Sequence, residues 1–192
     1  AVAQLFAASR PNGVVSLTLF RNHYGDSEYI TAWKGRVASV VFAGSGATIR
    51  CESIFTALKR PGLRAHYQTG CRHALYDPGC GINNQAYKIA GTLSAVSGLT
   101  ATSVAFQSQS TGWLTGGYLR VGGVPRMITQ HSGDTVTLSS VLPGLAVGSA
   151  FEAFAGCDRS FSTCQSKFGN SLNFGGFPWM PAKNPFAGDS IV

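Results

Sequence analysis

The order of apolar and polar residues predicts β-strands along the first third of the chain. Residues 14–21 (VVSLTLFR) alternate loosely between apolar and polar positions, and residues 29–42 (YITAWKGRVASVVF) form a long β-branched and aromatic run. Residues 47–53 (ATIRCES) follow the turn AGSG, so the second and third segments are predicted to form a β-hairpin.

The spacing changes to a helical one in two places. In SIFTALKRPG, Ile54 and Leu58 suit a short helix that Ser53 opens and Pro61-Gly62 end. The segment CDRSFSTCQSKFGN predicts a second short helix, capped by Asp158 and ended by Gly169-Asn170.

Strands are predicted again in the second half of the chain. They lie in the segments YKIAGTLSAV, TSVAFQS, GGYLRVGGVPRMITQHSGDTVTLSS and AFEAFAG, of which the third holds three short strands separated by Gly-Gly and Ser-Gly-Asp turns. The tail SLNFGGFPWMPAKNPF has too much Gly and Pro for a regular element, yet its aromatic residues should bind it to a surface. The predicted fold is therefore mainly β with short helices.

Composition and charge narrow the possible partners. The 192 residues include only 12% charged residues against 44% hydrophobic ones, which suits either a β-rich protein inside an assembly or an ordinary β domain with a bland surface. The net charge of +7 is scattered without a basic stripe, so specific nucleic-acid binding is not expected. The sequence contains no run of 18 apolar residues, so no membrane-spanning segment is predicted. The opening residues make a poor signal peptide and lack an initiator Met, which suggests a processed chain or part of a longer one.

Five cysteines carry the candidate chemistry. Cys51 lies in a predicted strand and is expected to be a small buried side chain. The other four, called here the cysteine set, form two local pairs: Cys71 with Cys80, and Cys157 with Cys164. Two disulfides, a structural zinc site and an iron–sulfur cluster all remain open, although separations of nine (71 to 80) and seven (157 to 164) positions are loose for zinc knuckles. Glycine precedes three members of the set, which would let the backbone approach an inorganic centre.

An enzyme is not expected. Cys71 with His73, or Cys80 with the distant His131, could be drawn as nucleophile and base, but no third group orients the first pair. His131 lies in a predicted hairpin turn and is expected to be solvated. The eight acidic residues stand mostly beside turns or caps, and the chain has neither a P-loop nor a Gly-x-Gly-x-x-Gly motif after a strand.

Two segments resemble a known family. YQTGCRHALYDPGCG and GCDRSFSTCQSKFGNSLNFGGFPWMP resemble the carboxy-terminal module of the tail tip protein L of lambda-like phages and the hub protein of gene transfer agents and related siphophage tails. The WKGRV strand and the segment IRCES with the following Leu-Lys-Arg are similar to the region before that module, so the resemblance covers roughly residues 29–182. It implies that the cysteine set ligates a 4Fe–4S cluster, with zinc as the alternative, and that the aromatic tail wraps over this centre rather than docking a partner.

The resemblance also implies a function. It predicts a structural protein of the virion, assembled in the cytoplasm of the bacterial host, that joins the tail tube or distal tail ring to the central fibre, as a homotrimer. Residues 1–65 would be a partial β-rich hub or tail-ring domain with small barrel-like or sandwich-like portions, and residues 66–192 a β-rich module holding the four-cysteine centre. The alternatives are a zinc-stabilised β-rich binding module and, less favoured, a tail-associated cell-wall hydrolase.

Overall fold

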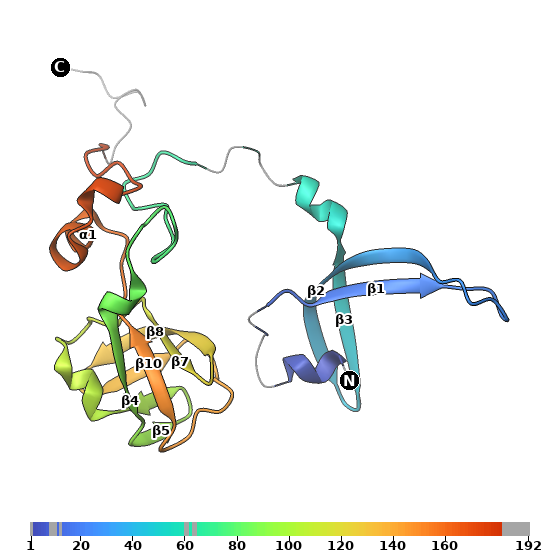
Figure 1. The fold of residues 1–192 in the computed structure, drawn as a ribbon, viewed down its shortest axis with the longest axis horizontal. Helices are drawn as coiled ribbons and strands as arrows, with labels where there is room; N and C mark the ends of the chain where they lie inside the picture. Colours follow the sequence, from blue (N-terminus) through green and yellow to red (C-terminus); the bar gives the residue numbers. More distant parts are fainter. Residues whose placement is uncertain (1, 8–10, 12, 60–61, 63–64, 182–192) are drawn as a thin grey trace. The chain divides into compact units, whose positions relative to one another are not determined.

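The computed structural model describes residues 2–7, 11, 13–59, 62 and 65–181, and the chain forms two compact units, Ala1–Gly62 and Leu63–Val192. Each unit is built around its own antiparallel sheet (Figure 1). Among the described residues, no helix is long and apolar enough to cross a bilayer. The predicted mainly β fold with short helices is confirmed.

The first unit is a three-stranded sheet in the order β1-β2-β3. Its elements are the 3₁₀-helix η1 (Val2–Phe6), β1 (Ser16–Arg21), β2 (Ile30–Ala43), β3 (Gly46–Ser53) and the 3₁₀-helix η2 (Ile54–Lys59). All three strands follow the predicted segments, and Ala43 pairs with Gly46 beside the tight hairpin turn. The predicted helix after Ser53 is present as a 3₁₀-helix.

This sheet buries little of its apolar surface. Val37 is 7% exposed, whereas Leu19 and Phe42 remain about half exposed at 50% and 49%. On the strands, Arg36 and Glu52 form an exposed ion pair of 2.7 Å across β2 and β3, and such a pair adds little stability. The apolar side chains of the first unit are therefore mostly open to solvent within the described residues.

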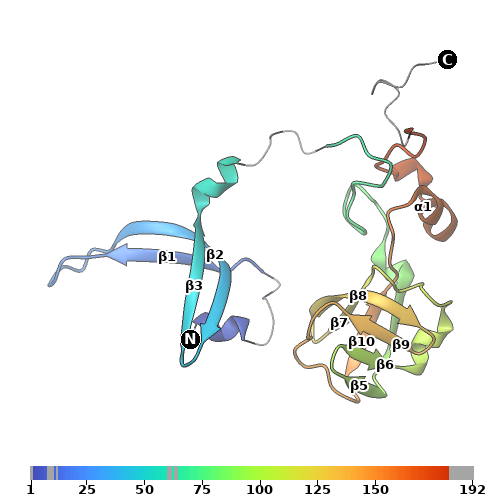
Figure 2. The ribbon, with the colours of Figure 1, turned by 180° about the vertical axis from the view of Figure 1, so that it is seen from behind.

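The second unit contains a seven-stranded antiparallel sheet in the order β4-β10-β7-β8-β9-β6-β5. The strands are β4 (Lys88–Thr92), β5 (Ala95–Ser97), β6 (Thr100–Thr102), β7 (Tyr118–Val121), β8 (Val124–Ser132), β9 (Thr135–Leu138) and β10 (Ala150–Phe154). Strands β4 and β5 follow each other directly in the chain but occupy opposite edges of the sheet. The sheet must therefore curl until its edges approach, and it does so as a half-barrel (Figure 2).

Side chains that alternate along the strands fill the inside of the half-barrel. Its buried core consists of Leu93, Ala101, Phe106, Leu114, Leu119, Val121, Ile128, Val136, Leu138, Leu142, Phe151 and Ala153. Phe106 packs against Phe151 with ring centroids 4.7 Å apart. His131 is also part of this interior: it is 2% exposed, its Nδ1 accepts from the Leu114 N–H, and its Nε2 lies 3.2 Å from Gly133 O. The prediction that His131 lies in a solvated turn is therefore wrong, because β8 continues through Ser132 and includes His131.

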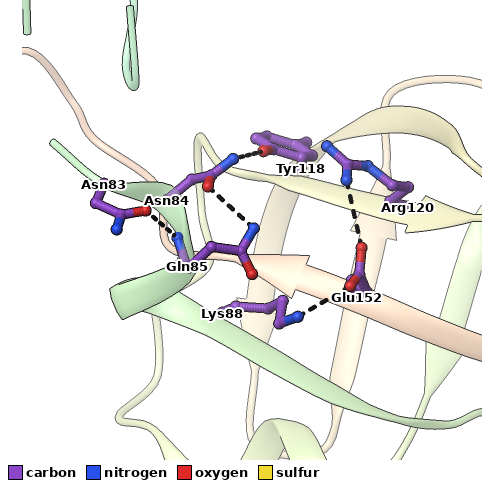
Figure 3. Close-up of polar contacts among 7 residues, drawn as sticks. All are labelled: Asn83, Asn84, Gln85, Lys88, Tyr118, Arg120 and Glu152. Atoms are coloured by element: carbon purple, nitrogen blue, oxygen red, sulfur yellow. Dashed lines mark hydrogen bonds and ion pairs between the residues drawn. The ribbon is translucent and has the colours of Figure 1, made fainter. Parts of the chain in front are cut away.

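A charged network lies on the outer face of the same sheet (Figure 3). Glu152 of β10 accepts from Lys88 Nζ at 3.1 Å and from Arg120 Nη1 at 3.3 Å. The hydrogen bond from Lys88 is the main reason why the pKa of Glu152 lies below its ordinary value. Arg120 also covers the Tyr118 ring, whose hydroxyl accepts from Asn84. Three neighbouring strands are therefore tied together on their solvent side.

One predicted strand is replaced by a helix turn. Residues 102–108 read as a strand, but Val104–Ser108 form the 3₁₀-helix η4, capped by Ser103. The Ser103 hydroxyl accepts from the Ala105 N–H and donates to Thr92 O at 2.8 Å. Because Thr92 ends β4 and Ser103 follows β6, this hydroxyl joins two parts of the half-barrel where the sheet curls.

We expect the Ser103 hydroxyl to stabilise the half-barrel. Ser103→Ala leaves the Thr92 carbonyl without this donor and removes a helix cap, so the free energy of unfolding should fall by about 1–3 kcal/mol in urea denaturation. Ser108→Ala is the matched control: its exposed hydroxyl bonds only within the same turn, at Ala105 O, and its loss should cost no more than about 0.5 kcal/mol. Equal losses for the two variants would contradict the role given to Ser103.

Candidate functional site

The cysteine set converges on one cavity of the second unit. Cys71, Cys80, Cys157 and Cys164 all line a cavity of about 210 Å³. The two pairs are 77 positions apart (80 to 157), so the fold brings distant segments together. Cys71, Cys80 and Cys164 are buried and Cys157 is partly buried, and all four are free thiols. Disulfides within or between the pairs are therefore absent from this structure.

The first pair sits at the two ends of a loop that Asp77 organises. The Asp77 carboxylate accepts from the Cys80 N–H at 2.6 Å and from the Ala74 N–H at 3.1 Å. These backbone donors, Cys80 first, lower the pKa of Asp77. Tyr76 adopts a left-handed backbone conformation with φ of 68°, and its hydroxyl donates to Ala155 O at 2.8 Å. The loop is thus closed on itself and fastened to the segment that leads from β10 to Cys157.

The second pair is positioned by β10 and by α1 (Phe161–Phe168). Cys157 follows β10 closely, and Cys164 lies one turn into α1, on its buried side. The helix is capped by Ser160, whose hydroxyl accepts from the Thr163 N–H, rather than by the predicted Asp158. Asp158 instead accepts from Ser160, which fixes the turn before the helix. The helix ends at Gly169 in the left-handed conformation, as predicted.

The glycines that precede three of the cysteines were predicted to let the backbone approach an inorganic centre, but the structure gives another reason for them. A Cβ on Gly156 would collide with the backbone of Thr115 and Gly117, and one on Gly79 would collide with the His73 ring. Gly70 has only an ordinary contact, 3.7 Å from Arg159 O. Two of the three glycines are therefore required by the packing of the protein itself, not by the approach of a ligand.

Polar groups surround the four sulfurs. The Gly175 N–H donates to Cys71 Sγ, and the Arg159 N–H donates to Cys157 Sγ, each at 3.3 Å. Asn170 Nδ2 donates to Cys80 O at 2.6 Å and lies 3.9 Å from Cys80 Sγ. The Cys164 thiol donates to Asn170 O at 3.3 Å. Backbone and amide donors aimed at sulfur stabilise thiolates and are a usual feature of ligated cysteines.

Asn170 also lines the cavity but was not predicted as a site residue, whereas His73 was considered only as a candidate base. Asn170 follows Gly169, the left-handed residue that ends α1, and was therefore interpreted only as part of the helix end. Its side chain and its carbonyl bond to Cys80 and Cys164, one cysteine from each pair. Its place immediately after a helix that carries a candidate ligand is the signal that could have identified it.

Burial makes Cys157 and Cys164 hard to ionise in the absence of a cation. It is the main cause that raises the pKa of both thiols, and nearby groups raise it further: Asp158 for Cys157, Cys157 for Cys164, and Cys71 and Cys80 for both. This mutual influence reflects how closely the set is gathered. A bound cationic centre would reverse the effect, since it favours the thiolate form.

Four thiols that line one cavity are a ligand set that either a structural zinc ion or an iron–sulfur cluster can take. Four sulfurs at the usual Zn–S distance of about 2.3 Å lie only about 3.8 Å from one another and leave no cavity between them. Among the described residues, no group of three or more His, Cys, Asp or Glu side chains lies close enough to hold one metal ion. The four thiols and the Gly175 and Arg159 N–H donors are the groups of this cavity that could hold a thiolate-bound metal centre.

The geometry gives little support to a cysteine nucleophile. His131 is held inside the half-barrel by Leu114 and Gly133 and does not line the cavity that holds Cys80. His73 does line that cavity, but its ring fits between two glycines. Cys51, the remaining thiol, belongs to the other unit and is partly rather than fully buried.

The aromatic tail lies partly over the cysteine set. Phe174 packs against Phe161 of α1, with ring centroids 5.2 Å apart, next to the Gly175 N–H that reaches Cys71. Trp179 stays 84% exposed although it touches Phe161. Phe186, the last aromatic residue of the tail segment that was predicted to bind to a surface, lies outside the described residues.

Two families of phage proteins match different parts of the chain. Residues 14–83 match the family described as "Baseplate hub protein, N-terminal attachment domain", and residues 110–184 match "Phage conserved hypothetical protein BR0599". The chain is similar to phage baseplate hub proteins. The predicted class of protein, a phage-particle component with a virion location, is confirmed at this level. The narrower prediction of tail tip protein L with its cluster stays a prediction.

A solved structure and a bacterial protein are also similar to the chain. A chain in the solved "Virion of native gene transfer agent (GTA) particle" has a TM-score of 0.71 at 23% identity, over 91% of this chain and 66% of that one, which shows a shared fold. An uncharacterized protein of Xylella fastidiosa (strain 9a5c) is 35% identical over 104 residues, covering 50% of this chain. The chain spans only 21% of that relative.

We expect Asn170 to hold the two cysteine pairs together. Asn170→Ala removes the donor to Cys80 O and should lower the free energy of unfolding by about 1–3 kcal/mol in urea denaturation. Asn173→Ala is the control, because Asn173 lies in the same segment and its side-chain amide donates to Asn170 Oδ1 and not to a cysteine. Its loss should cost less than about 1 kcal/mol. If the Asn170→Ala and Asn173→Ala variants have equal free energies of unfolding, Asn170 does not hold the two cysteine pairs together.

Proposed function

We propose that the chain is a structural part of a phage tail-tip or baseplate hub, and that its second unit holds a 4Fe–4S cluster on the cysteine set. The observation that carries this proposal is the convergence of two distant cysteine pairs on one cavity, in a chain whose two halves match phage families. The role is structural rather than catalytic.

The cluster would act as a cross-link. When bound, it supplies four iron–thiolate bonds that fasten the Cys71–Cys80 loop to β10 and α1. The chain's own contribution is to place the four sulfurs around one space and to aim the Gly175 and Arg159 N–H groups at two of them. By analogy with a disulfide that closes a loop of this length, the bond network would stabilise the fold by about 4 kcal/mol.

The first unit is proposed to contact neighbouring tail proteins. Its sheet has β1 and β3 at its edges and leaves apolar side chains such as Leu19 and Phe42 half exposed. Exposed edges and apolar faces are surfaces that an assembly covers. The partners proposed are the distal tail or tube ring and the central fibre, with the chain as a homotrimer assembled in the bacterial cytoplasm.

Anaerobic purification followed by iron, sulfide and zinc analysis tests the proposal. We expect about four iron and four sulfide ions per chain and a broad brown absorption. Cys71→Ser should lose the colour and most of the iron, because it removes one ligand. Cys51→Ser is the matched control: it alters a thiol of the other unit, so this variant should keep both the colour and the iron.

The opposite results separate the alternatives. A colourless protein with about one zinc ion per chain would replace the cluster by a zinc-stabilised binding module. Wild-type protein without iron after reconstitution with ferrous iron and sulfide would contradict the cluster altogether. Peptidoglycan release by the purified chain, absent in the Cys71→Ser variant, would favour a cell-wall hydrolase instead.

A further inference from the structure

The tail segment after α1 is fastened along the segment that carries Cys71. Phe177 N–H donates to Gln68 O at 2.8 Å, and Arg72 N–H donates to Gly175 O at 3.4 Å. Between these two bonds, the Gly175 N–H reaches Cys71 Sγ. The pairing of 177 with 68 and of 175 with 72 runs antiparallel, so a short strand-like strap crosses Cys71.

The close fit of this strap depends on two glycines, which have no side chain. A Cβ on Gly176 would lie 2.6 Å from Gly70 O and 2.7 Å from Thr69 O, which are backbone atoms that cannot turn aside. A Cβ on Gly175 would lie 2.5 Å from His73 Nε2 and 3.1 Å from Arg72 Cγ. The strap can therefore approach Cys71 only as a Gly-Gly pair, and one face of it rests on His73.

His73 touches a second glycine on its other side. A Cβ on Gly79 would lie 2.6 Å from His73 Cε1 and 3.2 Å from its Cγ, and each of its three nearest atoms belongs to this ring. Gly79 directly precedes Cys80. The imidazole is thus held between the backbone that delivers Cys80 and the strap that bonds to Cys71, and it also lines the cavity.

We infer that His73 is a positioning residue, whose flat ring sets the distance between the Gly79 backbone and the Gly175 strap and so shields Cys71 and Cys80. Its role is to fill space between two glycines, not to ligate or to carry a proton. The inference concerns the packing of the thiol cavity, and it depends on the proposed cluster only where iron is measured.

The thiols themselves report on this role. The 192-residue chain, purified without metal, is alkylated with iodoacetamide, and the rate at each cysteine is followed by mass spectrometry. His73→Ala should speed alkylation of Cys71 and Cys80 by about tenfold, because the strap opens locally more often, while Cys164 on α1 changes by less than about twofold. His73→Phe keeps a flat ring of similar width and should preserve the wild-type rates. Equal acceleration in the Ala and Phe variants would overturn the packing role and indicate a chemical one.

A double-mutant cycle tests the contact directly. Gly79→Ala should speed alkylation of Cys80 in the wild-type background, because its methyl group collides with the ring. The same change should have little further effect in the His73→Ala background, where the ring is gone. Gly70→Ala is the control, with its nearest contact at an ordinary 3.7 Å. If Gly79→Ala speeds alkylation of Cys80 by the same factor in the wild-type and His73→Ala backgrounds, the inference is refuted, whether or not the protein carries iron.

Iron content separates this inference from the proposed function. If wild-type protein holds iron, His73→Phe should retain it and His73→Ala should lose it faster to a chelator. If wild-type protein holds none, the cluster proposal fails while the alkylation pattern still supports or overturns the role of His73.

Discussion

The cysteine cavity depends on the close approach of two backbone segments, residues 115–117 and 155–157. Side chains at Gly117 or Gly156 would overlap the opposite backbone, and the approach is fixed by the bond from Gly156 N–H to Trp113 O. Lys167 of α1 reinforces it by donating to Trp113 O and Gly156 O. Because β10 belongs to the half-barrel, this contact transmits the rigidity of the sheet to Cys157.

The other three cysteines are attached to this fixed point by polar contacts. Tyr76 connects the first loop to Ala155, and Asn170 connects Cys80 to the end of α1. The loop itself is stiffened by Asp77. The cavity is therefore preorganised by the protein before any centre binds, which reduces the entropy that binding must overcome. The raised pKa values of Cys157 and Cys164 are a consequence of this preorganisation, since burial is their main cause.

Local signals in the sequence predicted local structure well. Alternation located the three strands of the first unit, and the capping residues located α1 to within two positions of its cap. Curling of the second sheet was beyond local signals, because it follows from a strand order that places β4 and β5 at opposite edges. The spacing of the cysteines was enough to propose two local pairs. That both pairs line one cavity results from tertiary contacts. His131 was misassigned because a hairpin turn and a buried strand end differ only in where the strand stops.

The two units differ in how much of their stability is internal. The half-barrel has a continuous buried core, whereas the first unit has Val37 as its one buried hydrophobic side chain among the described residues. A three-stranded sheet with so little burial is marginal alone. Stability in the first unit would then be gained on assembly, when neighbouring proteins cover its apolar side chains and edges. The second unit carries both the continuous core and the four thiols, so under the proposed function its metal centre would form without waiting for that step.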